Sequence, residues 1–164
     1  MPDPELTIRA ASEADVRDFA KWRYEAPFEV YSITDPVDEA VEYFLRPTTR
    51  CHVIESGDEL AGFITFGSDG QVPGGDYTAP ATDIGLGIRP DLTGRGLGAG
   101  FVAAVVAYAE EAFGPDPLRV TIATANVRAR KVWAGLGFTE TQRFQSSQRV
   151  LGTNEFAVLE RGPA

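Results

Sequence analysis

Four glycines and one arginine fall within residues 94–100, directly before an apolar pattern of helical period. The first turn of a helix leaves backbone N–H groups without partners and carries a partial positive charge. Glycine lets a phosphate approach these amides closely, and an arginine can add a charge-assisted hydrogen bond. The pattern therefore predicts an anion site, with a merely flexible loop as the alternative. The residues that would form this site are Gly94, Arg95, Gly96, Leu97, Gly98, Ala99 and Gly100.

The identity of the anion depends on what surrounds the glycines. A P-loop requires Gly-Lys-Ser/Thr, which the chain lacks. The spacing Gly94-x-Gly96-x-x-Ala99 does match a dinucleotide fingerprint, but that fingerprint expects an acidic residue roughly 20 positions later, at the end of the next strand. Here the next predicted strand ends in Thr124-Ala125-Asn126. A nucleotide-binding protein of another fold therefore remains an alternative with weak support.

The elements that position this turn follow from hydrophobic periodicity and turn residues. The predicted order is a strand, two helices, a hairpin, a long loop, a strand, the glycine turn, a helix, a strand, a helix and two strands. Because no linker or low-complexity segment interrupts the 164 residues, we expect one α/β domain over residues 1–164. The predicted ranges are strand 6–11, a helix capped by Ser12, a helix opened by Asp35-Pro36 with Val37, Val41, Phe44 and Leu45 inward, hairpin strands 51–55 and 60–66, loop 67–80, strand 81–88, helix 98–113, strand 118–124, helix 127–136, and strands 138–147 and 154–159.

The chain carries a formal net charge of -9, which argues against nucleic acid as a partner because phosphate contacts need Lys and Arg. The charge is uneven: residues 1–90 hold 7 basic and 17 acidic side chains, whereas residues 91–164 hold 8 basic and 7 acidic ones. The first half would attract a cation, and the second half could tolerate an anion. The alternative is that the acidic surface only aids solubility.

Cys51 and His52 are the only cysteine and the only histidine of the chain. An internal disulfide and a zinc cluster are therefore excluded, and we expect no metal and a reducing, cytoplasmic location. No apolar run approaches the roughly 20 residues of a membrane span, and the first residues do not resemble a secretory signal, so we expect no membrane partner. We interpret Cys51 as a small core residue and His52 as a structural residue of a strand.

Two motifs in the second half of the chain resemble those of the GNAT N-acetyltransferase superfamily. Residues 95–100 (Arg-Gly-Leu-Gly-Ala-Gly) fit its Q/R-x-x-G-x-G/A signature, and residues 83–90 look like the strand that precedes it. Further along, Asn126-x-x-Ala129 followed by Gly137-Phe138 looks like its second motif. The order of elements over residues 7–160 is similar as well. The resemblance implies an α/β fold with a mixed, partly splayed sheet of about six to seven strands and about four helices, with acetyl-CoA as the donor.

The resemblance also implies roles for single residues. The backbone of Leu86, Gly87 and Ile88 would hydrogen-bond the pantetheine arm of the coenzyme as a neighbouring strand would. The turn at residues 94–100 would hold its pyrophosphate. Asn126 would contact the coenzyme near its thioester end, and a plain helix N-cap is the other reading of that residue.

Transfer of an acetyl group from a thioester needs a neutral amine, a base for its proton and often an acid for the departing thiolate. Family members often carry a tyrosine where this chain has Trp133 and a glutamate where it has Thr121. Trp133 is therefore expected to pack against the coenzyme or the core. The resemblance makes Asp83 the candidate catalytic residue, because other members carry a catalytic glutamate close to this position; a strand-edge or helix-capping acid is the alternative. Weaker candidates lie in segments that resemble acceptor-side loops: Glu25, Glu29, Asp76 and Tyr77.

These observations favour an N-acetyltransferase that moves the acetyl group of acetyl-CoA to a primary amine of a small molecule or peptide by direct attack. A non-catalytic CoA-binding or sensing module on the same fold is the alternative, because two common catalytic positions are empty. The acidic first half favours a cationic acceptor. A homodimer stays open, since relatives often pair through sheet edges and late strands. An aromatic stretch would wall the acceptor pocket unless it packs within a loop; its members are Trp22, Tyr24, Phe28 and Tyr31.

Overall fold

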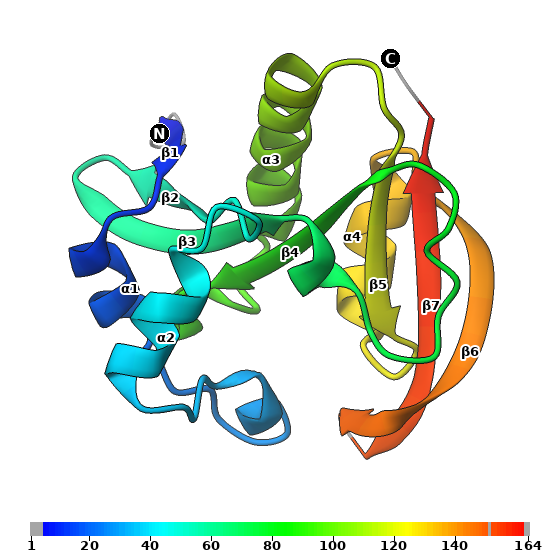
Figure 1. Ribbon diagram of the computed structural model, residues 1–164, viewed down its shortest axis with the longest axis horizontal. Coiled ribbons are helices and arrows are strands. Elements are labelled where there is room, and N and C mark those ends of the chain that lie inside the picture. Colours follow the sequence, from blue (N-terminus) through cyan, green and yellow to red (C-terminus); the bar gives the residue numbers. More distant parts are fainter. Residues whose placement is uncertain (1–4, 151, 163–164) are drawn as a thin grey trace.

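The computed structural model describes residues 5–150 and 152–162, which form one mixed sheet flanked by helices (Figure 1). Over these residues the sheet has seven strands and is accompanied by four α-helices, which confirms the fold that the resemblance implied. The bounds are β1 (Leu6–Ala10), α1 (Glu13–Phe19), α2 (Val37–Phe44), β2 (His52–Ser56), β3 (Glu59–Phe66), β4 (Thr82–Ile88), α3 (Gly98–Phe113), β5 (Leu118–Ala123), α4 (Val127–Gly135), β6 (Thr139–Val150) and β7 (Thr153–Arg161), with short 3₁₀ turns at Glu29–Tyr31, Ser68–Gly70 and Pro90–Leu92.

The sheet is splayed at its centre. Its strands are ordered β1-β2-β3-β4-β5-β7-β6, and all neighbouring pairs are antiparallel except β4 and β5. Those two strands run parallel but pair only at Thr82 with Leu118 and at Asp83 with Arg119. Beyond these residues β4 stays with β3 and β5 stays with β7, so the two strands diverge (Figure 1). Their carboxyl ends therefore share no ladder pairing, and we call the region between these two strand ends the gap.

Different helices cover the two faces of the sheet. Because side chains alternate along a strand, Val53 of β2 and its neighbour Ile54 belong to separate hydrophobic clusters. The cluster of Val53 includes α1 and α2, where Phe19 stacks on Phe63 of β3 with ring centroids 4.2 Å apart. The cluster of Ile54 includes the buried face of α3 together with Trp133 of α4. Helical layers on both faces thus hold the two halves of the splayed sheet.

Local signals explain where the helices begin and end. Ser12 caps α1 as predicted and forms a capping box with Asp15. Helix α3 spans residues 98–113 as predicted and stops at Gly114, whose φ of 75° suits glycine. The prediction that Leu45 faces inward is wrong: α2 ends before this residue, which is 39% exposed. No helix in the described part of the chain is both long and apolar enough to cross a membrane.

A buried ion pair links β4 and β5 at the end of the sheet where the two strands still pair. Arg119 donates from Nε to Oδ1 of Asp83 at 2.6 Å and from Nη2 to Oδ2 at 2.9 Å, and both side chains are almost wholly buried. Gln71 donates to the same Oδ2 at 2.9 Å. The carboxylate raises the pKa of the Arg119 guanidinium above its usual value. The pair therefore ties the two strands together immediately before they separate.

Arg119→Met leaves the Asp83 carboxylate buried without its cation, so we expect the free energy of unfolding to fall by about 3 kcal/mol. Urea denaturation followed by circular dichroism measures the change. The matched control is Arg17→Met, which breaks exposed pairs with Glu13 and Asp38 and should cost far less. Equal losses in the two variants would contradict the structural role assigned to the buried pair.

Candidate functional site

The backbone amides of residues 94–100 form the centre of the candidate site. None of these N–H groups donates to an acceptor among the residues that the structure describes. The first helical hydrogen bond of α3 runs from the Phe101 amide to the Leu97 carbonyl at 3.2 Å. A run of unpartnered amides at the start of a 16-residue helix attracts negative charge. The turn can therefore bind an anion through its backbone alone.

Each of the other three described helices has a side-chain cap or acidic residues in its first turn; α2, for example, lacks a cap but has Asp38 and Glu39. Helix α1 begins with a capping box, and α4 begins with Asn126, whose Oδ1 accepts from the Ala129 amide at 3.3 Å. Helix α3 has Leu97 at the equivalent position, without a side-chain cap and without an acidic residue in its first turn. Although the chain has 24 acidic residues, the positive end of α3 has neither a side-chain cap nor an acidic residue in its first turn.

Two kinds of glycine occupy the turn. Gly94 and Gly96 have φ values of 71° and 75°, a region that L side chains rarely adopt, so the fold itself requires glycine there. A Cβ added at Gly98 or Gly100 would meet nothing closer than 3.5 Å. Because glycine in a helix is less stable than alanine, the fold alone gives no reason for these two. Room for a ligand beside the backbone amides would be a reason for glycine at both positions.

Two arginines reach the turn without a carboxylate partner in the described part of the chain. Arg95 is exposed, and its Nη1 donates to the Asp91 carbonyl at 3.4 Å. Arg128 lies in the first turn of α4, and its Nη1 is 2.8 Å from where a Cβ of Gly94 would be. The Asp91 carboxylate accepts from Arg89 Nε at 2.6 Å, which lowers the pKa of that carboxyl. The turn is thus bordered by free positive charge, and its neighbouring acid is already paired.

Arg128 is a site residue that the sequence did not reveal. The available signal was its place inside the motif that starts at Asn126, two positions after the cap. Its guanidinium lies over the Phe28 ring, 5.2 Å from the centroid, and Phe28 in turn stacks on Tyr31 with centroids 6.4 Å apart. Two residues separated by a hundred positions in the chain are therefore in contact beside the turn.

The open edge of β4 presents backbone groups to the gap. The Arg89 amide donates to the Ala61 carbonyl of β3 at 2.9 Å, which turns the amides and carbonyls of odd-numbered β4 residues toward β3. By strand alternation, those of Leu86 and Ile88 face the opposite way, into the gap. These are two of the three residues predicted to bind a coenzyme arm through their backbone.

Gly87, the third of those residues, has a different reason to be glycine. Its position between Leu86 and Ile88 turns its amide and carbonyl toward β3. An added Cβ would lie 2.3 Å from the ring of Phe63, which covers this part of the strand. The register therefore assigns Gly87 a packing role, and only its two neighbours offer backbone groups to a ligand in the gap.

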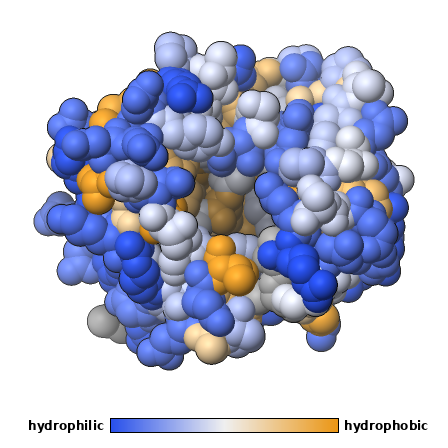
Figure 2. All heavy atoms as spheres, turned by 60° about the horizontal axis from the view of Figure 1, so that its bottom comes forward, coloured by the Kyte–Doolittle hydropathy of each residue, from blue (hydrophilic) through white to orange (hydrophobic). Residues whose placement is uncertain are grey.

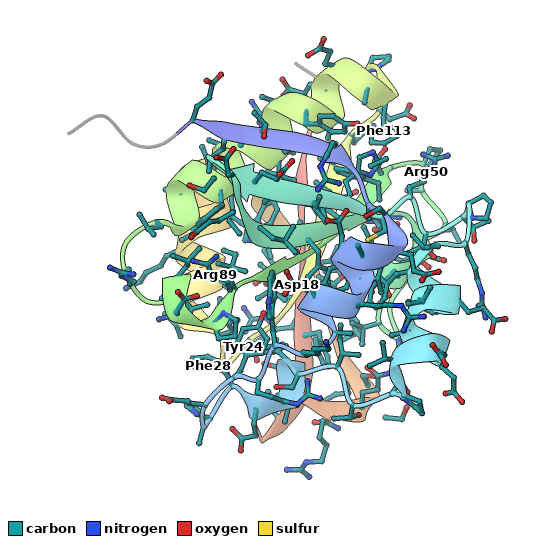
Figure 3. The ribbon with its side chains drawn as sticks, turned by 90° about the vertical axis from the view of Figure 1, so that its left-hand side faces the viewer. Asp18, Tyr24, Phe28, Arg50, Arg89 and Phe113 are labelled. Atoms are coloured by element: carbon teal, nitrogen blue, oxygen red, sulfur yellow. The ribbon has the colours of Figure 1, made fainter. Side chains whose placement is uncertain are left out.

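The α1–α2 segment (residues 20–36) lies across the open end of the splay. On the β4 side, the Tyr24 hydroxyl donates to the Ile88 carbonyl at 2.6 Å. On the α4 side, the Tyr31 hydroxyl accepts from Asn126 Nδ2 at 3.4 Å. Figure 3 shows Tyr24 and its neighbour Phe28 on this segment. The segment thus contacts both sides of the gap, at two residues to which the family resemblance assigns coenzyme binding.

The surface that includes this end of the molecule is hollowed. In Figure 2 apolar residues line the base of the hollow, and mostly hydrophilic ones surround it. An apolar base with a polar rim suits a ligand that has an extended arm and a charged end.

Two predicted site residues lie in the interior. Asp83 is 4% exposed, and its carboxylate is engaged by Arg119 and Gln71. This geometry favours the structural acid that the sequence left open beside a catalytic base. Trp133 is 6% exposed and meets Phe138 edge to face, with ring centroids 5.0 Å apart. It packs in the core, and a contact with the coenzyme stays a prediction.

Thr121 is tied to the long loop at residues 67–80. Its Oγ1 lies 2.8 Å from the Tyr77 hydroxyl, which also accepts from the Val72 amide at 3.0 Å. The Arg119 guanidinium lies over the Tyr77 ring, 5.0 Å from its centroid. The loop therefore fixes Tyr77 against β5 by contacts on three sides.

Cys51 and His52 lie away from the turn, near the other end of α3. Burial raises the pKa of the Cys51 thiol to about 12, which fits a core residue and not a nucleophile. His52 Nδ1 donates to the Arg50 carbonyl at 2.7 Å, and its ring packs against Tyr108. A pocket of about 290 Å³ opens beside them, near Arg50 and Phe113 in Figure 3. Among the described residues, no group of three or more His, Cys, Asp or Glu could hold a metal ion.

The comparison with protein-family models identifies one family. Residues 5–139 match the family model described as the acetyltransferase (GNAT) domain.

The structure is similar to spermidine N-acetyltransferase from Vibrio cholerae in complex with CoA and spermine, with a TM-score of 0.78, 17% identity, and coverage of 96% of this chain and 95% of that chain. It is also similar to a candidate acetyltransferase from Salmonella typhimurium with its cofactor acetyl-CoA (TM-score 0.68, 17% identity, 96% and 93% coverage). A candidate phosphinothricin N-acetyltransferase gives a TM-score of 0.72 at 18% identity, with 98% and 99% coverage. No curated protein matches the chain. At these identities the solved structures establish the fold alone.

If Gly98 and Gly100 are glycines to admit a ligand, the Gly98→Ala/Gly100→Ala variant should bind CoA at least about tenfold more weakly, a loss of about 1.4 kcal/mol. The same variant should be more stable without ligand, by about 0.5 kcal/mol or more per site. Calorimetric titration with CoA and thermal unfolding of the free protein measure the two effects.

Gly135→Ala in α4 is the matched control, because an added Cβ there also meets open space. It should raise stability and leave the CoA affinity unchanged. Unaltered CoA affinity in the Gly98→Ala/Gly100→Ala variant would remove the turn from the site.

Proposed function

The chain belongs to the acetyltransferase (GNAT) family, and we propose that it transfers the acetyl group of acetyl-CoA to the primary amine of a small cationic acceptor. The observation that carries this proposal is the run of unpartnered amides at the uncapped start of α3, beside the open edge of β4. These two features together suit a ligand with a diphosphate at one end and an amide-containing arm.

The diphosphate of acetyl-CoA would be held by the amides of residues 94–100, those of Leu97 and Ala99 included. Arg95 and Arg128 supply the positive charge, since neither has a carboxylate partner in the described part of the chain. A guanidinium can bind phosphate oxygens in bidentate fashion. Their position supports anion binding at this turn even though the net charge of the chain is -9.

The pantetheine arm would run along the gap between β4 and β5. The amide and carbonyl of Leu86 face it, and they would pair with the amide groups of the arm. Asn126 uses its Oδ1 to cap α4, so toward a ligand it offers the N–H groups of Nδ2. It would therefore donate to a carbonyl of the arm or of the thioester. The cap and the coenzyme contact are thus compatible.

The chemistry proposed is direct attack of a neutral amine on the thioester carbonyl. The nitrogen–carbon bond forms, the carbonyl oxygen takes up negative charge, and the carbon–sulfur bond then breaks. A backbone amide at the open edge of β4 would donate to that oxygen, which is the usual form of oxyanion stabilisation. The ammonium proton passes to water. Asp83 has no catalytic part in this scheme, because Arg119 and Gln71 engage its carboxylate.

A cationic acceptor is supported by the charge around the gap. Glu25 and Glu29 on the α1–α2 segment are exposed and make no ion pair among the described residues. Unpaired carboxylates next to a cleft raise the local concentration of a cation. The similar protein from Vibrio cholerae is a spermidine N-acetyltransferase solved with spermine, and a polyamine is therefore the first acceptor to try.

A non-catalytic CoA-binding module is the second candidate. It is favoured by one observation: Trp133 lies in the core and Thr121 is tied to Tyr77, so neither position presents an acid or a base. CoA binding without acetyl transfer to any amine would distinguish this candidate from the enzyme.

The test is release of the CoA thiol from acetyl-CoA in the presence of spermidine, spermine, phosphinothricin or a basic peptide. We expect turnover to be fastest with the polyamines. Calorimetric titration with CoA runs in parallel. Binding with no turnover on any amine would select the non-catalytic module, and absence of both would end the assignment.

The Glu25→Gln/Glu29→Gln variant should raise KM for spermidine about 3–10-fold, because two attractive charges are lost from the acceptor side. KM for acetyl-CoA should stay within about twofold of the parent value. The control is Glu111→Gln/Asp116→Asn, which removes the same charge near the other end of α3 and should change neither constant. Equal shifts in the two variants would mean that only the net charge matters.

A further inference from the structure

The hydroxyl proton of Tyr31 has no acceptor in the described part of the chain. Its oxygen accepts from Asn126 Nδ2 at 3.4 Å, and because the Asn126 oxygen already binds the Ala129 amide, the amide cannot be reversed to accept from Tyr31. The phenolic proton must then point away from Asn126. It is free to donate to water or to a ligand that lies beside Asn126.

No other tyrosine shares this property at the site. All five tyrosines of the chain lie among the described residues. The other four are engaged or distant: Tyr24 donates to the Ile88 carbonyl, Tyr43 to the Asp69 carboxylate, Tyr77 lies against Thr121 and the Val72 amide, and Tyr108 packs on His52 near the other end of α3.

The position of Tyr31 is fixed relative to the glycine turn. Its ring stacks on Phe28 with an interplanar angle of 18°, and Phe28 lies beneath the guanidinium of Arg128, which borders Gly94. These contacts place the hydroxyl further along the same rim, next to Asn126. A coenzyme held by its diphosphate at Gly94 would extend its arm in this direction.

The environment of the phenol suits a proton donor. Burial of the hydroxyl raises the pKa of Tyr31 above its usual value, so the group stays protonated at neutral pH. The residue as a whole is 40% exposed, so water can reach it. A phenol that is protonated and close to solvent can give up a proton and regain it in each cycle.

We propose that Tyr31 is a catalytic residue that donates its hydroxyl proton to the coenzyme sulfur when the thioester bond breaks. The inference rests on the proposed function. As the carbon–sulfur bond breaks, its electron pair stays on sulfur, and the phenolic proton moves to that sulfur to give the CoA thiol. The phenolate regains a proton from water, which has received the proton lost by the amine. Trp133, buried in the core, has no part in this step.

The first test needs no acceptor amine. Free CoA is bound at saturating protein concentration, and the pKa of its thiol is obtained from the rate of alkylation by iodoacetamide against pH. A hydrogen bond from Tyr31 stabilises the thiolate, so Tyr31→Phe should raise the pKa of the bound thiol by about 1 unit, a tenfold change in acidity. The Kd for CoA should change by less than about threefold, because one contact of many is lost. Cys51 is buried and will not compete for the reagent.

Tyr108→Phe is the matched control, since it removes a phenol hydroxyl away from the gap and should leave the thiol pKa unchanged. With an active amine, Tyr31→Phe should lower kcat about 10–100-fold while KM for acetyl-CoA stays within about threefold. Thermal unfolding should be the same in both variants.

The outcomes separate the two proposals. If the parent protein binds no CoA, the proposed function and this inference fail together. If CoA binds but Tyr31→Phe leaves both the thiol pKa and kcat unchanged, only the role of Tyr31 is overturned.

Discussion

The whole site depends on the point at which β4 and β5 stop pairing. A strand edge that loses its neighbour must find other partners for its amides and carbonyls, or leave them to water or a ligand. Here the two strands share a buried ion pair and two residue pairs before they diverge. The gap that opens is polar along the β4 edge because of its exposed backbone, and α3 begins beside its end without a cap. The proposed binding of the diphosphate and that of the pantetheine arm both depend on this single break in the pairing of β4 with β5.

The chemistry proposed for the gap is divided between backbone and side chains. Backbone amides hold charge at the glycine turn, where the two unpaired arginines strengthen the field. Side chains of the α1–α2 segment supply the phenols that face β4 and α4. In this proposal neither Trp133 nor Thr121 needs to supply an acid or a base, because the proton donor comes from the α1–α2 segment.

Local features were predictable from the sequence, and contacts between distant segments were not. The bounds of α3, the Ser12 cap and the glycine turn follow from periodicity and from residue types that act over one helical turn. The packing of Arg128 on Phe28 joins segments a hundred residues apart, so no local pattern reports it. The sequence left Asp83 open between a catalytic base and a structural acid, because it shows the carboxylate but not its pairing with Arg119. The packing role of Gly87 required the register with β3.

Gly98 and Gly100 also have a consequence for the lifetime of the folded protein. Two glycines and no cap make the first turn of α3 one of the easiest parts of the chain to fray. A ligand that binds only the folded form adds RT ln(1 + [L]/Kd) to the free energy of unfolding. A coenzyme seated on this turn would therefore slow the degradation of the chain as well as supply the reaction, and the amount of enzyme in a cell would follow the abundance of its own cosubstrate.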